Sequence, residues 1–251
     1  MFTRPLFLKR KENKMTEQQT EKTNQNKNRI RTRRLVECAA MVALGTVLSL
    51  IKIPVGHLGG SITLLSALPL VYVCYKHGVK WGFASAFVYS ILQMLVDIPT
   101  VVKIFAPGEG LVWYMALLSI ALDYIVAFTA IGLASLFSNM KNPTAALGLG
   151  AFVGLMARYI SSFFSGWIFY GAWASWYFDP SETDNFASIS EGTAKFGAWV
   201  LSTFGDGQGL AAFYSAFYNG LYMIPEIIIT VIGAVGISFI PFVKDKNRNL
   251  R

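Results

Sequence analysis

Long apolar runs alternate with short polar loops over most of this chain, a pattern that predicts membrane-spanning helices. A helix that crosses the hydrocarbon core of a bilayer needs about 20 mostly apolar residues. Six runs approach that length, although the second is short and is expected to be tilted or partly re-entrant. They are Leu35–Ile51, Ser61–Tyr75, Val79–Val96, Leu111–Phe137, Ala145–Tyr170 and Phe213–Ile240. The sequence therefore predicts an all-α integral membrane protein with about six transmembrane helices.

The two ends of the chain are polar and basic, unlike the part between them. We expect residues 1–34 to be a disordered tail, residues 35–240 a membrane domain and residues 241–251 a second basic tail. Eleven of the 22 Lys and Arg residues precede Leu35, and four follow Pro241. Because positive residues gather on the cytoplasmic side of membrane proteins, both termini are predicted to be cytoplasmic. Charges placed beside apolar runs indicate topology, so no nucleic-acid partner is expected.

The composition agrees with a chain that lies mostly in lipid. Hydrophobic residues make up 54% of it and charged residues 14%, whereas a soluble domain usually carries about 25% charged residues. The sequence holds no P-loop, no H-E-x-x-H and no G-x-S-x-G motif, which are the signatures of common ATPases, metalloproteases and hydrolases. We therefore predict a protein that is not an enzyme, with no catalytic residues, no metal site and no cofactor.

Three ionisable side chains lie inside the apolar runs, where such groups are costly and usually mark function. Asp123, Arg158 and Glu226 each fall about 12–13 residues into their runs, near the middle of the bilayer at 1.5 Å per residue. We expect them to face one another or a shared cavity. A buried ion pair that only holds helices together is favoured for Arg158 and Glu226, whereas a ligand contact is favoured for Asp123.

Polar and small residues recur every four positions in the last two runs, so each set shares one helix face. The sets are Arg158, Ser162, Gly166 and Tyr170 in the fifth run, and Tyr214, Tyr218, Tyr222 and Glu226, with Asn219 beside them, in the sixth. Tyrosine rings stack on other rings and attract cations over their faces. The sixth run therefore predicts a pocket for a polar aromatic molecule. For the fifth run, a seam of helix packing is the alternative.

The longest loop of the predicted membrane domain, residues 171–209, lies between the last two runs. It carries five acidic residues against a single basic residue, Lys195, and several aromatic residues. Two interpretations remain open. The loop is either an aromatic belt at the membrane interface or a lid whose negative potential gathers cationic ligands.

Four segments resemble the substrate-binding (S) component of energy-coupling-factor vitamin transporters, in the thiamine branch of that family. They are GGSITLLSALPLVYVCYKHGVKWG (59–82), LDYIVAFTAIGLA (122–134), RYISSFFSGWIFYGAW (158–173) and YSAFYNGLYMIPE (214–226). The resemblance implies six helices in a bacterial plasma membrane, with a small ligand, thiamine or an analogue, bound near the outer side. It also implies partners that this chain lacks: a membrane-embedded coupling subunit and two ATPase subunits.

The resemblance also implies a substrate-binding site. Its positions in this chain are Asp123, Tyr124, Ser162, Gly166, Tyr170, Tyr214 and Asn219. Asp123 stands where the family usually has Glu, Ser162 where it often has His, and Tyr170 where it often has Trp. Because these departures fall within the site, a different thiamine-like or other small vitamin ligand remains an alternative to thiamine.

The Ala39-x-x-x-Ala43 pair in the first run resembles the patch with which the family meets its coupling subunit. Small residues four apart allow another helix to approach closely. A stand-alone secondary transporter, which would need no such partner, is the remaining alternative.

Overall fold

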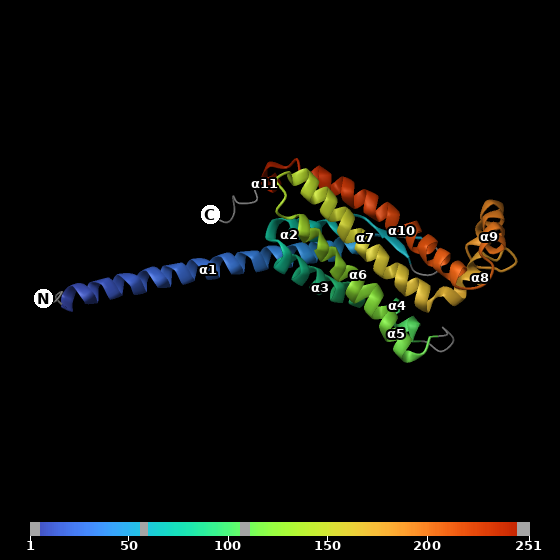
Figure 1. Ribbon diagram of the computed structural model, residues 1–251, viewed down its shortest axis with the longest axis horizontal. Coiled ribbons are helices and arrows are strands. Elements are labelled where there is room, and N and C mark those ends of the chain that lie inside the picture. Colours follow the sequence, from blue (N-terminus) through green and yellow to red (C-terminus); the bar gives the residue numbers. More distant parts are fainter. Residues whose placement is uncertain (1–5, 56–59, 106–110, 245–251) are drawn as a thin grey trace.

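The computed structural model describes residues 6–55, 60–105 and 111–244, and most of these are helical. Parts of both predicted tails (residues 1–5 and 245–251) and Gly59 of the GGSITLL segment lie outside the described residues. The α-helices, labelled as in Figure 1, are α1 Leu6–Ser49, α2 Leu68–His77, α3 Val79–Val96, α4 Ile98–Ile104, α5 Trp113–Ile120, α6 Ala127–Ala130, α7 Pro143–Phe169, α8 Ala174–Phe178, α9 Glu191–Phe204, α10 Gln208–Ile237 and α11 Pro241–Lys244.

Within the described residues, four helical stretches are long and apolar enough to cross a membrane: Val79–Val96, Trp113–Phe137, Pro143–Phe169 and Gln208–Ile237. The second of them changes character along its length. Between α5 and α6 lies a π-helical turn, η1 (Ala121–Val126), and after α6 comes a 3-10 segment, η2 (Ile131–Phe137). The predicted all-helical membrane fold is confirmed, whereas the count of six spans and the side on which the termini lie stay predictions.

The second predicted span differs from the structure. Its first residues form strand β2 (Ser61–Thr63), which pairs antiparallel with β1 (Lys52–Pro54). Leu65 then adopts a positive φ of 59°, and α2 begins only at Leu68, with Pro69 in its first turn. Proline fits the first turn of a helix and not its interior. The 10-residue helix α2 is therefore shorter than the predicted span Ser61–Tyr75.

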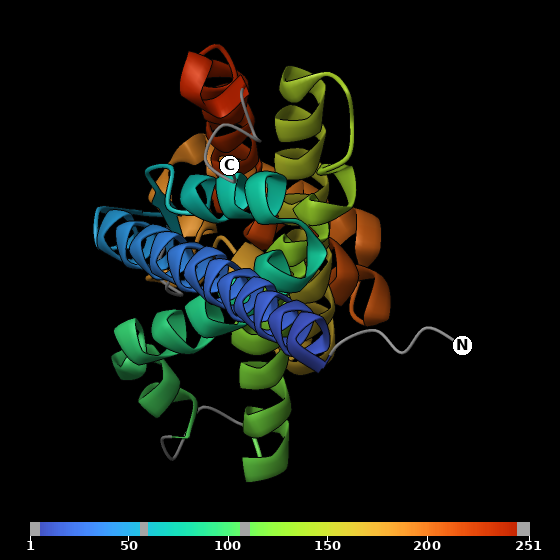
Figure 2. The same cartoon turned by 90° about the vertical axis from the view of Figure 1, so that its left-hand side faces the viewer.

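The amino-terminal segment also differs from what we expected. Residues 6–34, predicted to be disordered, form the first part of the 44-residue helix α1. The segment is rich in Lys, Arg, Glu and Gln, which are good helix formers, and it continues an apolar helix, so no separate nucleation is needed. Figures 1 and 2 show this part of α1 projecting away from the other helices. Low apolar content therefore indicated a lack of packing here, and not a lack of helix.

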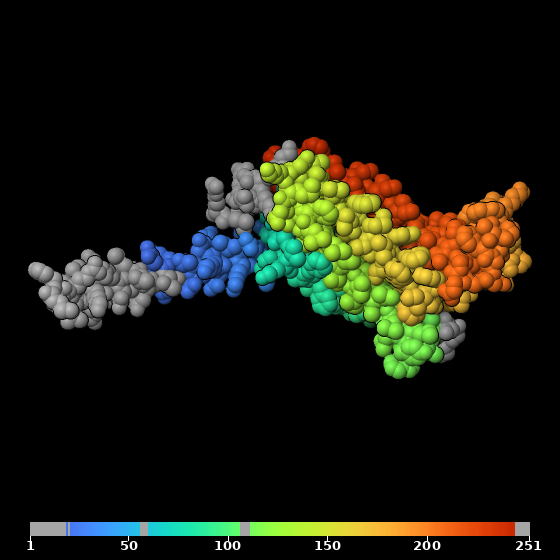
Figure 3. Space-filling view, in the orientation of Figure 1, coloured from blue at the N-terminus to red at the C-terminus, as the bar shows by residue number. Residues whose placement is uncertain are grey.

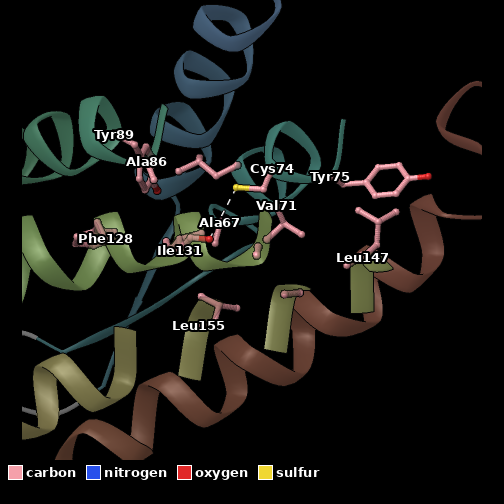
Figure 4. Packing of buried hydrophobic residues seen from close by; sticks show 14 of the residues in the cluster. Ala67, Val71, Cys74, Tyr75, Ala86, Tyr89, Phe128, Ile131, Leu147 and Leu155 are labelled. Atoms are coloured by element: carbon pink, nitrogen blue, oxygen red, sulfur yellow. Dashed lines mark hydrogen bonds between the residues drawn. The ribbon is translucent and has the colours of Figure 1, made fainter. Parts of the chain in front are cut away.

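The helical body holds one large core. Buried residues of α2, α3, α6, η2 and α7 meet there, including Cys74, Tyr89, Ile131 and Leu155 (Figure 4). The thiol of Cys74 lies 3.8 Å from the carbonyl oxygen of Ile131, the contact drawn as a dashed line. The core fixes α2 and α3 against η2 and α7, while α10 packs along α7 (Figure 1).

The long loop between α7 and α10 is folded. It contains two 3-10 turns, η3 (Gly171–Trp173) and η4 (Ala187–Ile189), with the helices α8 and α9. Tyr177 and Phe178 of α8 are buried against Leu210 and Tyr214 of α10, and form a second, smaller apolar cluster. Figure 3 shows this segment as a lobe at the end of the molecule that lies far from the start of α1.

Candidate functional site

The candidate site involves η1 and α10, which both pack against α7, and strand β2, which packs against α10. Asp123 sits in the π-helical turn η1. Such turns are rare, and they occur frequently at functional sites. Asp123 remains partly exposed although its helix packs against α3 and α7. A carboxylate that is accessible at this depth is available to a ligand.

Serine hydroxyls, and not a cation, hold the Asp123 carboxylate. The hydroxyl of Ser165 on α7 donates to Asp123 Oδ2 at 2.6 Å, and that of Ser119 on α5 donates to the same oxygen at 3.3 Å. Among the residues that the structure describes, no Lys, Arg or His forms an ion pair with Asp123. Neither serine was among the predicted site residues.

Ser119 also connects the carboxylate to Tyr170, the residue that directly follows α7. The two hydroxyl oxygens, Ser119 Oγ and Tyr170 Oη, lie 2.9 Å apart. The structure thus brings together two of the predicted binding residues, Asp123 and Tyr170, through a third residue that was not predicted. The signal in the sequence was that Ser119 precedes Asp123 by four residues, a spacing that places two side chains on one helix face.

The predicted residues Ser162, Gly166 and Asn219 meet where α7 crosses α10. Asn219 Nδ2 donates to the Ser162 carbonyl oxygen at 3.3 Å and to the Ser215 carbonyl oxygen at 2.9 Å. A Cβ atom on Gly166 would lie 2.3 Å from Ser215 Oγ and 3.2 Å from Asn219 Nδ2. Gly166 therefore permits the close approach of the two helices, which is the packing seam that the sequence left as an alternative.

Tyrosine rings form a ladder along one face of α10. Tyr214, Tyr218 and Tyr222, the tyrosine ladder, follow one another with ring centroids 5.9 Å apart at each step. The hydroxyl of Tyr222 donates to the side-chain oxygen of Asn219. The ring of Tyr177, in the long loop, contacts the first two rings of this ladder, with centroids 5.1 Å from that of Tyr214 and 5.9 Å from that of Tyr218. The ladder offers flat aromatic faces beside hydrogen-bonding groups.

Tyr124 is placed differently from the other predicted tyrosines. Its ring is buried in the large core, 6.3 Å from the ring of Phe128, whereas Tyr170 and Tyr214 belong to the smaller cluster. The π-helical turn directs Tyr124 and its neighbour Asp123 to different surroundings. Tyr124 therefore lies in different surroundings from Tyr170 and Tyr214, and its assignment to the binding site stays a prediction.

The other two intramembrane charges form an ion pair. Arg158 Nη1 lies 3.0 Å from Glu226 Oε1, and the guanidinium carbon of Arg158 lies 4.2 Å from the centroid of the Phe128 ring. Glu226 is 1% exposed. Thr63 of β2 donates to the same carboxylate oxygen at 2.8 Å. The pair that we favoured from the sequence is thus present, and it involves a strand that the sequence analysis did not include.

The predicted coupling face lies on α1. Ala39 and Ala43 are exposed, whereas Cys38 and Val42 on the other side of the helix are buried. Exposed apolar residues continue along that face and nearby positions of α1, among them Val36, Leu44 and Val47. The Ala39/Ala43 face is therefore open to another helix.

The long loop keeps its acidic character at the surface. Hydrogen bonds from the hydroxyl and the backbone N–H of Ser181 lower the pKa of Asp179 below its ordinary value, so this carboxylate stays charged near neutral pH. Trp199 of α9 is exposed. Aromatic and acidic residues thus coexist on this lobe, and both interpretations of the loop stay open. No cluster of metal-ligating side chains occurs within residues 6–55, 60–105 and 111–244.

Comparison with known proteins identifies the family. The family model described as Thiamine transporter protein (Thia_YuaJ) matches residues 35–177, more than half of the chain. Thiamine transporter ThiT of Bacillus subtilis (strain 168) is 25% identical over 221 residues, which cover 83% of this chain and 90% of that protein. A solved structure of ThiT from Listeria monocytogenes shares the fold, with a TM-score of 0.58 at 20% identity over 85% of this chain and 98% of that one. The chain therefore belongs to the thiamine transporter protein family and is a multi-pass protein of the plasma membrane.

Proposed function

We propose that this chain is the substrate-capture subunit (S component) of an ATP-driven vitamin uptake transporter and that it binds thiamine. One observation carries the proposal. A partly exposed carboxylate, Asp123, is held by serine hydroxyls deep in an apolar bundle, with no cationic partner among the described residues. An unpaired carboxylate in such a place is costly. A cationic aromatic ligand relieves that cost, and thiamine carries a positively charged thiazolium ring.

The residues near Asp123 suit the rest of such a ligand. Tyr170 lies one hydrogen bond away from the Ser119 that contacts the carboxylate. The tyrosine ladder presents aromatic faces, on which rings stack and over which cations are attracted. Asn219 hydrogen-bonds to Tyr222 and to backbone carbonyls, and thereby fixes the orientation of that ring. The names of the relatives point to the same ligand.

Energy for uptake would come from other subunits. The sequence has no P-loop, and the Ala39/Ala43 face on α1 is exposed, as a contact with a membrane-embedded coupling subunit requires. In this proposal the chain captures its ligand from outside, the long loop covers it, and the loaded protein reorients in the bilayer when its partners hydrolyse ATP.

The test of ligand identity is to purify the full chain in detergent, to identify co-purified small molecules by mass spectrometry, and to titrate thiamine by calorimetry. We expect saturable binding of thiamine and much weaker binding of a neutral analogue in which a thiophene ring replaces the thiazolium. Binding of both compounds with equal affinity would contradict the role of the carboxylate. Binding of neither would contradict the proposed ligand.

The test of partner dependence uses proteoliposomes that contain this chain alone. We expect them to bind radiolabelled thiamine without accumulating it, whether or not a proton or sodium gradient is imposed. Accumulation driven by an ion gradient would instead identify a stand-alone secondary transporter.

A further inference from the structure

Strand β2 and the residue before it, Gly60, are attached to α10 at two points. The backbone N–H of Gly60 donates to the hydroxyl of Tyr218 at 2.9 Å, and the hydroxyl of Thr63 donates to Glu226 Oε1 at 2.8 Å. Along α10 the eight residues from Tyr218 to Glu226 rise about 12 Å at 1.5 Å per residue. Along the strand, the three steps from Gly60 to Thr63 cover about 10 Å at 3.3 Å per residue. The two segments therefore run alongside each other with matching lengths.

The packing between these two attachments is close. A Cβ atom on Gly60 would lie 2.6 Å from a ring carbon of Tyr222 and 3.2 Å from the hydroxyl oxygen of Tyr218. Gly60, directly before β2, therefore lies against the rings of Tyr218 and Tyr222, which we assign to the binding site. A small shift of the strand would displace the rings, and a shift of the rings would displace the strand.

The second attachment, the hydrogen bond from Thr63 to Glu226, depends on a fully buried charge. Glu226 is 1% exposed, and its Oε1 atom accepts hydrogen bonds from Arg158 as well as from Thr63. Arg158 satisfies the charge of the carboxylate, and Thr63 uses that fixed acceptor to anchor β2. Thr63 also shares a hydrogen bond with Ser66, at 2.6 Å, in the turn that leads to α2. Three parts of the chain, α7, α10 and the β2–α2 segment, thus converge on one carboxylate.

We propose that strand β2 is a wall of the ligand site, and that Glu226 is a positioning residue that sets the place of this wall through Thr63 without touching the ligand. This inference rests on the proposed function, because it assumes that the tyrosine ladder contacts the ligand. It assigns to the Arg158–Glu226 pair a role in affinity beyond holding helices together.

The test compares three conservative variants of the full-length protein. Thr63→Val keeps the side-chain shape and removes the hydroxyl, and Thr63→Ser restores the hydroxyl. Thr230→Val is the matched control: Thr230 lies four residues beyond Glu226 on α10, is fully buried, and its hydroxyl has no hydrogen-bond partner within the described part of the chain. Each variant is purified, melted, titrated with thiamine by calorimetry, and analysed by hydrogen exchange of the peptide that contains Gly60 and Thr63.

We expect Thr63→Val to weaken thiamine binding about tenfold, which corresponds to about 1.4 kcal/mol, and to speed exchange at the Gly60 amide in the absence of ligand. Thr63→Ser should stay within about twofold of the wild-type affinity. Thr230→Val should leave affinity and Gly60 exchange unchanged, even if its melting temperature shifts.

Two results would overturn the inference: wild-type affinity and wild-type Gly60 exchange in Thr63→Val, or an equal loss of affinity in Thr230→Val, which would indicate general loosening. If the wild-type protein bound no thiamine, the proposed function would fail by itself. The exchange measurement would then still decide, without a ligand, whether Thr63 and Glu226 hold the strand in place.

Discussion

A carboxylate in the middle of an apolar helix is costly, and at Asp123 neutral serine hydroxyls offset only part of that cost. Arg158, the cation at similar predicted depth, contacts Glu226 instead. An alternative role for Asp123, in which it pairs with Arg158 and only holds helices together, is not supported by any ion pair among the described residues. What remains is a partly exposed carboxylate with no ion-pair partner in the part of the chain that the structure describes.

Replacing Asp123 by Asn should weaken thiamine binding about 10- to 150-fold, because a hydrogen bond to a charged group contributes about 1.5–3 kcal/mol. Asn keeps the size of the side chain, so the melting temperature should change little. Calorimetric titration beside a thermal melt measures both quantities. Unchanged affinity with a lowered melting temperature would show that the carboxylate has a structural role only.

Removing one partner of the Arg158–Glu226 pair should lower the free energy of unfolding by about 3–5 kcal/mol, because an uncompensated charge stays buried. Arg158→Met with Glu226→Met removes both charges, and this double variant should be more stable than either single variant. Thermal melts of the three proteins in the same detergent measure the difference. Additive effects would mean that the two side chains do not interact.

At this scale the sequence predicted the charges better than their neighbours. Spacing placed Arg158 and Glu226 at one depth, and their pairing follows from depth and opposite sign. Ser165 was not predicted because the four-residue spacing from Arg158 to Tyr170 includes Ser162, and Ser165 lies three positions after it. The surroundings of Tyr124 could not be predicted, because a π-helical turn changes side-chain directions and apolar patterning contains no signal for such a turn.

Among the elements, α7 and α10 have the closest approach at the site. Gly166 lets the Ser215 side chain of α10 lie against the α7 backbone, where Ser215 Oγ donates to the Phe163 carbonyl oxygen at 2.6 Å. The Asn219 side chain crosses the same seam to Ser162. One crossing thus fixes the helix that carries the serines against the helix that carries the tyrosine ladder.

Gly166→Ala should separate these helices and lower both stability and thiamine affinity, since the added methyl group would lie 2.3 Å from Ser215 Oγ. Gly236→Ala is the control, because a Cβ at Gly236 near the end of α10 meets nothing within 4 Å. Alanine is the better helix former by about 1 kcal/mol, so the control should not lose stability. Adding Ser215→Ala to Gly166→Ala should recover part of the loss. Thermal melts and calorimetry measure these changes, and equal behaviour of the two glycines would contradict a tight crossing.

The elements that the sequence predicted well are long and continuously apolar: Val79–Val96 and Pro143–Phe169 differ from their predicted runs by at most two residues. The second run failed because hydropathy does not distinguish a short strand and a turn from the first half of a helix. Ser61, Ile62 and Thr63 include two β-branched residues, which favour strands, and that local signal was available.

At the scale of the whole molecule, the candidate ligand site and the Ala39/Ala43 face are separate. The site involves η1, α7, α10 and β2, whereas the face lies on the exposed side of α1. Binding and assembly should therefore respond to different substitutions.

Replacing Ala39 and Ala43 together by Trp should abolish uptake in cells that contain the coupling and ATPase subunits, because large side chains prevent close packing of helices. The purified double variant should bind thiamine with wild-type affinity. Radiolabelled uptake and calorimetry measure the two effects. A parallel loss of affinity would show that this face also supports the binding site.

The projecting part of α1 is a straight extension of a helix that also packs in the membrane domain. From Leu35 back to Gln19 the helix rises about 24 Å at 1.5 Å per residue, and it continues α1 without a break. If the membrane-embedded body tilted during transport, Gln19 would be displaced further than Leu35, because it lies at the outer end of this straight segment. A rotation of the helices within the bilayer would thereby produce a displacement in water, which a single spectroscopic probe attached at position 19 can measure.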